Sequence, residues 1–102
     1  MRIVFVTVSS MTDGESLAKA LVEARLAACV QILPQMTSIY LWEGEVQKGT
    51  EHLILIKTLP EKWKQLRDLI SANHSYDVPE IVAIDAKEVS QRYLDWMNSI
   101  LS

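Results

Sequence analysis

The residues best suited to chemistry in this 102-residue chain gather in one polar segment, His74–Glu80, with the sequence HSYDVPE. A histidine, a tyrosine (Tyr76) and two carboxylates (Asp77 and Glu80) stand within seven positions there. A histidine beside carboxylates can bind a metal ion or exchange protons near neutral pH. The segment also follows an expected helix, and a helix C-terminus favours a surface histidine through its dipole. Spacing alone leaves both interpretations open.

Cys29 is the only cysteine of the chain. Its thiolate would be a soft ligand for copper(I) or zinc. A free cysteine is also among the residues most often buried as small apolar groups. Because no CxxC pair exists within one chain, packing is the favoured interpretation for a single copy. An oligomer would bring several copies of Cys29 together and would reopen the metal interpretation.

Weaker candidates lie between these two positions. Glu43 and Glu45 would share one face of a strand, although solvated hairpin charge is the favoured interpretation. Lys57 closes an expected strand and could hold an anion, whereas a salt bridge is the commoner outcome. His52 is expected to be exposed to solvent. The chain has no Ser-His-Asp spacing, no phosphate-binding glycine loop and no HExxH motif, so the residues predict no enzyme.

Composition limits the classes of protein to which the chain can belong. Apolar residues make up 49% of the chain and charged residues 23%, which is typical of a soluble protein, and the length predicts a single domain over residues 1–102. No apolar run approaches the roughly 18–20 residues of a membrane span, and no signal peptide opens the chain. One cysteine favours the cytoplasm. The net charge of −3 argues against a nucleic-acid partner.

Hydrophobic periodicity predicts four strands and three helices. In chain order they are a strand over 2–8, a helix over about 14–26, a long strand over 29–46, a turn at 47–50, a strand over 52–58, a helix over 60–73, a strand over 81–84 and a last helix from residue 90. Thr12 or Asp13 is expected to cap the first helix, and Thr58 with Glu61 has capping-box spacing. Pro34 should bend the long strand because proline cannot donate to a ladder.

This order, β-α-β-β-α-β with a trailing helix, predicts the α+β ferredoxin-like fold. Right-handed crossovers would place both main helices on one face of the sheet and leave the other face open. The long strand is apolar on both faces, with Ile39 and Leu41 on one and Tyr40 and Trp42 on the other. A strand that is apolar on both faces must be covered twice. The sequence therefore predicts an oligomer with Tyr40 and Trp42 in its interface.

Two stretches, LAACVQILPQMTSIYLWEGEV at 26–46 and HSYDVPEIVAI at 74–84, occur together with LILIKT at 53–58 and YLDW at 93–96. In combination they closely resemble the CutA divalent-cation tolerance family, in order and spacing, over essentially the whole chain. The family's usual form around the histidine is His-Pro-Tyr-Glu. In this chain Ser75 replaces the proline and Asp77 replaces the glutamate.

The resemblance implies a ferredoxin-like subunit in a PII-like homotrimer, in which long β-hairpins pair strands between subunits. It also implies a role in tolerance to divalent metals with copper binding, for which His74 and Cys29 are the candidate ligands. Some family members carry further metal ligands at two positions that are Val6 and Asn73 in this chain. Copper binding is therefore expected to be weak.

A second interpretation follows from the same resemblance. PII proteins are signalling trimers, so the chain could be a regulatory trimer that binds a small ligand or a partner protein in clefts between subunits. The residues expected to line such a cleft, besides His74, are Trp42, Lys57, Tyr76 and Glu80. Copper binding that is lost in His74→Ala would favour the metal-binding interpretation over the regulatory one.

Overall fold

The computed structural model describes all 102 residues. Its elements in chain order are β1 (Arg2–Val8), α1 (Met11–Glu23), β2 (Cys29–Ile32), β3 (Met36–Trp42), β4 (Glu45–Thr58), the short 3₁₀ helix η1 (Pro60–Lys62), α2 (Trp63–Asn73), β5 (Ile81–Asp85) and α3 (Gln91–Leu101). None of the helices has the length and apolar character that crossing a membrane would require.

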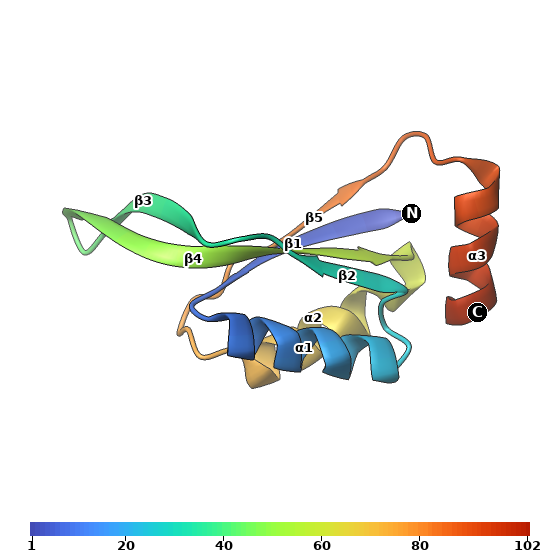
Figure 1. Cartoon of the computed structure of the whole chain (residues 1–102), viewed down its shortest axis with the longest axis horizontal. Coiled ribbons are helices and arrows are strands. Elements are labelled where there is room, and N and C mark those ends of the chain that lie inside the picture. The colour runs from blue at the N-terminus through green and yellow to red at the C-terminus, as the bar shows by residue number, and fades with distance from the viewer.

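The strands form an antiparallel sheet in the order β2-β4-β1-β5, with β3 paired to the other half of β4. Figure 1 shows α1 and α2 side by side on one face of this sheet. The predicted ferredoxin-like arrangement is confirmed. The 14-residue β4 pairs with different strands along its length. Its second half lies inside the sheet between β1 and β2, and its first half pairs with β3. The β3–β4 hairpin therefore projects well beyond the body of the protein (Figure 1).

The core lies between the sheet and the two helices. Alternate residues of the central strands, such as Val6 on β1 and Ile54 on β4, face the helices and are fully buried. They pack in one apolar cluster with Leu21 of α1 and with Leu66 and Ile70 of α2. The helix-facing side of the sheet is thus closed within a single chain.

The opposite face of the sheet is largely uncovered. Val82 and Ile84 of the edge strand β5 are about half exposed, at 51% and 50% of their surface. They lie in register with Phe5 and Ile3 of β1, which are only partly buried. Helix α3 stands at one end of the sheet and forms a separate small apolar cluster there (Figure 1). The single chain therefore leaves an apolar sheet surface open, as the sequence predicted.

The tight turn of the hairpin is at Glu43-Gly44, so the predicted turn at 47–50 is wrong. Trp42 pairs with Glu45, which leaves a two-residue loop, and both loop residues have positive φ (51° and 82°). That combination is the type I′ turn, whose twist matches that of the flanking strands. The glycine in the predicted turn, Gly49, instead lies within β4 opposite Ser38. A Glu-Gly pair is a weaker turn signal than Asn-Gly or Asp-Gly, which explains the error.

Replacing Gly44 by alanine is expected to destabilise the hairpin by about 1–2 kcal/mol, the cost of holding an L-residue in a left-handed conformation. No atom lies within 4 Å of the position that the new Cβ would take, so the effect comes from the backbone alone. Hydrogen exchange at the amides of β3 and β4 would measure the change. Gly49→Ala is the matched control, since its backbone does not lie in that region. Equal effects of the two variants would contradict the turn assignment.

Two predicted helix starts are also corrected. Helix α1 begins at Met11, because the Ser10 hydroxyl accepts the amide N–H of Asp13 at 3.1 Å, and neither Thr12 nor Asp13 is the N-cap. Thr58 does not cap the next helix, since its buried hydroxyl donates to the Leu26 carbonyl at 2.7 Å. This hydrogen bond connects β4 to the segment after α1. The predicted break at Pro34 is confirmed by the gap between β2 and β3.

Candidate functional site

His74 is the C-cap that follows α2, and it uses both ring nitrogens in hydrogen bonds. Its Nδ1 lies 3.0 Å from the backbone N–H of Tyr76, which can only donate, so Nδ1 is the acceptor. Its Nε2, 2.7 Å from the carbonyl oxygen of Thr7, therefore carries the proton and donates. The ring also contacts that of Tyr76, with centroids 4.7 Å apart. The neutral imidazole thus joins the 74–80 segment to the end of β1, and a metal ion would have to displace one of these bonds.

Tyr76 continues this network to Glu51 of β4. The phenol hydroxyl donates to the Glu51 carboxylate at 2.9 Å. Burial raises the pKa of Glu51, but hydrogen bonding with Ser38, Tyr76 and Thr7 outweighs burial, so the pKa is lowered overall. Burial and the bond to Glu51 raise the pKa of Tyr76 to about 12. At neutral pH Glu51 is therefore a carboxylate and Tyr76 a protonated donor.

A groove of about 660 Å³ lies over this network, between the β3–β4 hairpin and the 76–80 segment. Its volume falls in the range of roughly 300–1,000 Å³ that holds a small ligand. The lining includes three aromatic residues and three carboxylates, together with apolar and hydroxyl groups. The aromatic and acidic members are Tyr40, Trp42, Tyr76, Glu51, Asp77 and Glu80.

Of the five residues predicted to line a cleft between subunits, the structure brings three, Trp42, Tyr76 and Glu80, together in this groove within one chain, and His74 is not part of its lining. Lys57 lies elsewhere, with its Nζ 2.7 Å from the side-chain oxygen of Gln31. The sequence did not indicate Glu51, because the turn was predicted too late in the chain and the return strand was therefore expected to begin only at residue 52. With the turn at Glu43-Gly44, strand pairing places Glu51 opposite Met36 and beside the groove.

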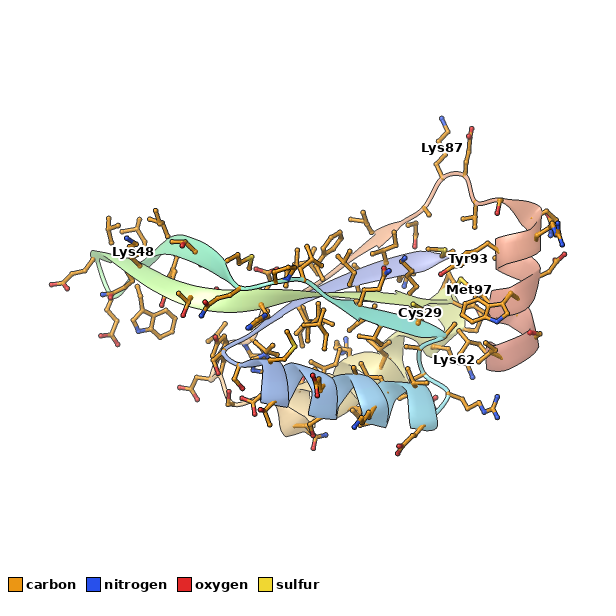
Figure 2. The ribbon with its side chains drawn as sticks, in the orientation of Figure 1. Cys29, Lys48, Lys62, Lys87, Tyr93 and Met97 are labelled. Carbon is orange, nitrogen blue, oxygen red and sulfur yellow. The ribbon has the colours of Figure 1, made fainter.

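Cys29 is half-buried on β2, and burial together with the nearby Cys29 thiol raises the pKa of Tyr93 on α3; Figure 2 labels both side chains in this region. Tyr93 packs against the small cluster under α3, and Met97 is fully buried within it. The packing role predicted for a single copy of Cys29 agrees with this position.

A single chain does not bring Cys29 and His74 together. Cys29 is in register with Lys57 and so with Ile3 of β1, whereas His74 bonds to Thr7 of the same strand. Four residues along a strand correspond to roughly 13 Å. No group of three or more His, Cys, Asp or Glu side chains in the chain could hold a metal ion. The residues of one chain therefore do not fit a copper centre.

Two weaker candidates are corrected. His52 is buried rather than exposed, with Nδ1 2.9 Å from the Leu33 carbonyl oxygen, because the longer β4 places it within the sheet opposite Val8. Glu43 and Glu45 do not share a strand face, since Glu43 lies in the turn and Glu45 begins β4. Both glutamates are exposed, in agreement with solvated hairpin charge.

Comparisons with known proteins agree with this architecture. The model of the family described as "CutA1 divalent ion tolerance protein" matches residues 2–100. The chain is 48% identical over 95 residues to the divalent-cation tolerance protein CutA of Thermus thermophilus, covering 93% of this chain and 92% of that protein. It is 42% identical over 97 residues to the chloroplastic CutA of Arabidopsis thaliana, covering 95% of this chain but only 53% of that protein.

The same relationship holds in three dimensions. The solved structure of CutA from Archaeoglobus fulgidus superposes with a TM-score of 0.96 at 36% identity, and each chain is covered completely. The Cut A1 structure from Thermus thermophilus gives a TM-score of 0.95 at 46% identity, again with complete coverage of both chains. Sequence, fold and coverage agree, and the chain therefore belongs to the CutA1 divalent ion tolerance protein family.

Proposed function

We propose that this protein acts in tolerance to divalent cations as a homotrimer with a regulatory rather than an enzymatic role. The family description and the names of the curated relatives support the metal-tolerance role. The cytoplasm is part of the proposal because the chain has a single cysteine. Localisation of a tagged full chain in its own cell would test the compartment.

The observation that carries the proposal is the exposed apolar surface of the hairpin. Ile39, Leu41 and Val46 are 70%, 71% and 72% exposed, although each is a large apolar side chain. A projecting two-stranded hairpin is marginally stable alone, and its unpaired edges can pair with another chain. Association of subunits would cover this surface. The expected number of three copies comes from the family resemblance.

The open face of the sheet supports association in the same way. Val82 and Ile84 continue a row of apolar side chains from β1, and no element of the chain covers them. Exposed apolar area of this kind costs roughly 25 cal/mol per Å² until it is buried. Light scattering on the purified protein would give its mass, and a mass of about one subunit at all concentrations would refute the proposed assembly.

Copper binding enters this proposal only as a weak contact through His74 and Cys29. Nδ1 of His74 is available to a metal only after the N–H of Tyr76 is released, which sacrifices a hydrogen bond worth about 0.5–1.5 kcal/mol. Further ligands would have to come from another subunit, because Cys29 lies at the other end of the sheet. Both features support a low affinity for copper.

Titration of the metal-free protein with copper(II) and zinc tests this contact. We expect saturable copper binding at no more than one site per subunit, weakened at least ten-fold by His74→Ala. His52→Asn is the matched histidine control, because asparagine keeps a donor for the Leu33 carbonyl. Cys29→Ala tests the second ligand. Unchanged binding in His74→Ala would refute the contact, and no binding by an assembled wild type would mean an indirect metal role.

A second candidate function is a PII-like regulatory trimer that binds a small ligand or a partner protein. The specific observation in its favour is the groove, which collects Trp42, Tyr76 and Glu80 beside the exposed hairpin. Binding in this groove would link ligand occupancy to the position of the hairpin. Such a protein would influence metal tolerance without holding the metal itself.

A further inference from the structure

We propose that the hydrogen bond between Tyr76 and Glu51 fixes the direction in which the β3–β4 hairpin leaves the sheet, and so prepares the hairpin for association with other subunits. Both residues act on assembly by positioning the hairpin. The inference deepens the proposed assembly and rests on it, because the hairpin carries the exposed apolar surface that association would cover. It requires no metal ion.

Glu51 lies at the root of the hairpin, where β4 changes its pairing partner. It pairs with Met36, the first residue of β3, whereas the next residue of β4, His52, pairs with Val8 of β1. Neighbouring residues of a strand point to opposite faces of the sheet. Glu51 and His52 can therefore hold β4 from its two faces, at the place where its projecting half joins the half inside the sheet.

On one face, a continuous chain of hydrogen bonds connects Glu51 to the body of the protein. The Tyr76 hydroxyl donates to the Glu51 carboxylate at 2.9 Å, and the Ser38 and Thr7 side chains also hydrogen-bond with it. The backbone N–H of Tyr76 donates to Nδ1 of His74 at 3.0 Å, and Nε2 of His74 donates to the Thr7 carbonyl oxygen at 2.7 Å. The chain of hydrogen bonds thus leads from β1 through the segment after α2 to both strands of the hairpin.

On the other face, the buried His52 holds the link between β2 and β3. Its Nδ1 lies 2.9 Å from the Leu33 carbonyl oxygen, and the Leu33 N–H donates to the Leu53 carbonyl oxygen at 2.9 Å. These contacts do not involve Tyr76, so they remain when the Tyr76 hydroxyl is removed. The Tyr76–Glu51 bond is therefore the contact that determines how the hairpin lies relative to the segment after α2.

Beyond its root the hairpin is separated from the 76–80 segment by the groove of about 660 Å³, so packing on this side does not prevent it from tilting. The seven-residue β3 spans roughly 23 Å, and a rotation of about 10° at its root moves the far end by about 4 Å. Interface cores pack as densely as protein interiors, so such a displacement would separate Ile39 and Leu41 from a partner subunit. A hairpin already held in its bound direction loses less freedom on association.

Light scattering over a dilution series of Tyr76→Phe tests the proposal. The variant loses only the hydroxyl and keeps the ring that contacts His74. We expect the dissociation constant of the assembly to rise at least ten-fold. Thr58→Val is the matched control, because it also removes one donating hydroxyl, but at the end of β4 that lies inside the sheet. It should lower the urea midpoint at least as much as Tyr76→Phe does and leave the dissociation constant unchanged.

A double-mutant cycle tests whether the hydroxyl acts through Glu51. Glu51→Ala is expected to raise the dissociation constant as Tyr76→Phe does, and the double variant is expected to be no weaker in assembly than the weaker single variant. Glu51→Gln keeps an acceptor oxygen for the Tyr76 hydroxyl, so it should assemble more tightly than Glu51→Ala. If Tyr76→Phe does not fold, Glu51→Ala takes its place in the comparison with Thr58→Val.

Equal dissociation constants for Tyr76→Phe and Thr58→Val, or additive effects in the cycle, would overturn the proposal. A wild type that is a monomer at every concentration would refute the proposed assembly instead. Hydrogen exchange at the amides of β3 would then test the positioning role in the single chain. Exchange several-fold faster in Tyr76→Phe than in Thr58→Val would support that role, and equal exchange in the two variants would overturn it.

Discussion

Replacing Ile54 by alanine will lower the free energy of unfolding by about 2–5 kcal/mol. Ile54 is fully buried on β4, where it lies opposite Val6 of β1 and Ile32 of β2. The change removes apolar contacts at the centre of the only large core of the chain and leaves a cavity there. Urea denaturation at fixed protein concentration measures the loss, because assembly would otherwise shift the midpoint.

Val22→Ala is the matched control for this prediction. Val22 is also an aliphatic residue but lies on the outer side of α1 with 41% of its surface exposed. Surface substitutions of this kind change stability by less than about 0.5 kcal/mol. A loss below 1 kcal/mol for Ile54→Ala would contradict the placement of the core between the sheet and α1 and α2.

Replacing Trp42 by alanine will weaken assembly by about 2 kcal/mol or more, which corresponds to a roughly 30-fold higher dissociation constant. Trp42 ends β3 at the projecting hairpin and remains half exposed in the single chain. Large aromatic side chains of this kind provide most of the binding energy in interfaces. Tyr40→Ala, two residues earlier on the same strand, is expected to act in the same direction.

A dilution series followed by light scattering or sedimentation measures this effect. Lys48→Ala is the control, because Lys48 lies near the end of the same hairpin (Figure 2) and is an exposed charge. Loss of one solvated lysine should leave assembly unchanged. If Trp42→Ala and Tyr40→Ala remain assembled over the same dilutions as the wild type, the assignment of this surface to the interface is wrong.

Local periodicity in the sequence predicted the fold, and the motif stretches at 26–46 and 74–84 carried the resemblance to the family. The apolar run of β1 indicates a central strand, and the apolar stripes of α1 and α2 indicate which side of each helix is buried; this information is contained in neighbouring residues. Pro34 marked the break between β2 and β3 for an equally local reason. The exposed apolar hairpin could also be anticipated, since a strand that is apolar on both faces cannot be covered by so short a chain.

Strand register was decided only by the tertiary structure. Gly44 and Gly49 are both glycines in polar surroundings, and only the pairing of Trp42 with Glu45 shows which of them turns the chain. Moving the turn lengthens β4, which buries His52 and brings Glu51 beside the groove. Such consequences depend on hydrogen bonds between strands and cannot be obtained from propensities of single residues.

The candidate site likewise depends on contacts between distant parts of the chain. His74 bonds to Thr7 across 67 positions, and Tyr76 bonds to Glu51 across 25. The sequence identified His74 and Tyr76 as chemically capable residues, but it could not show that both imidazole nitrogens are already engaged. It also grouped Lys57 with them, although strand pairing places Lys57 beside Cys29. Residue types determined which chemistry was available, and the packing of β1, β4 and the 74–80 segment decided which side chains meet.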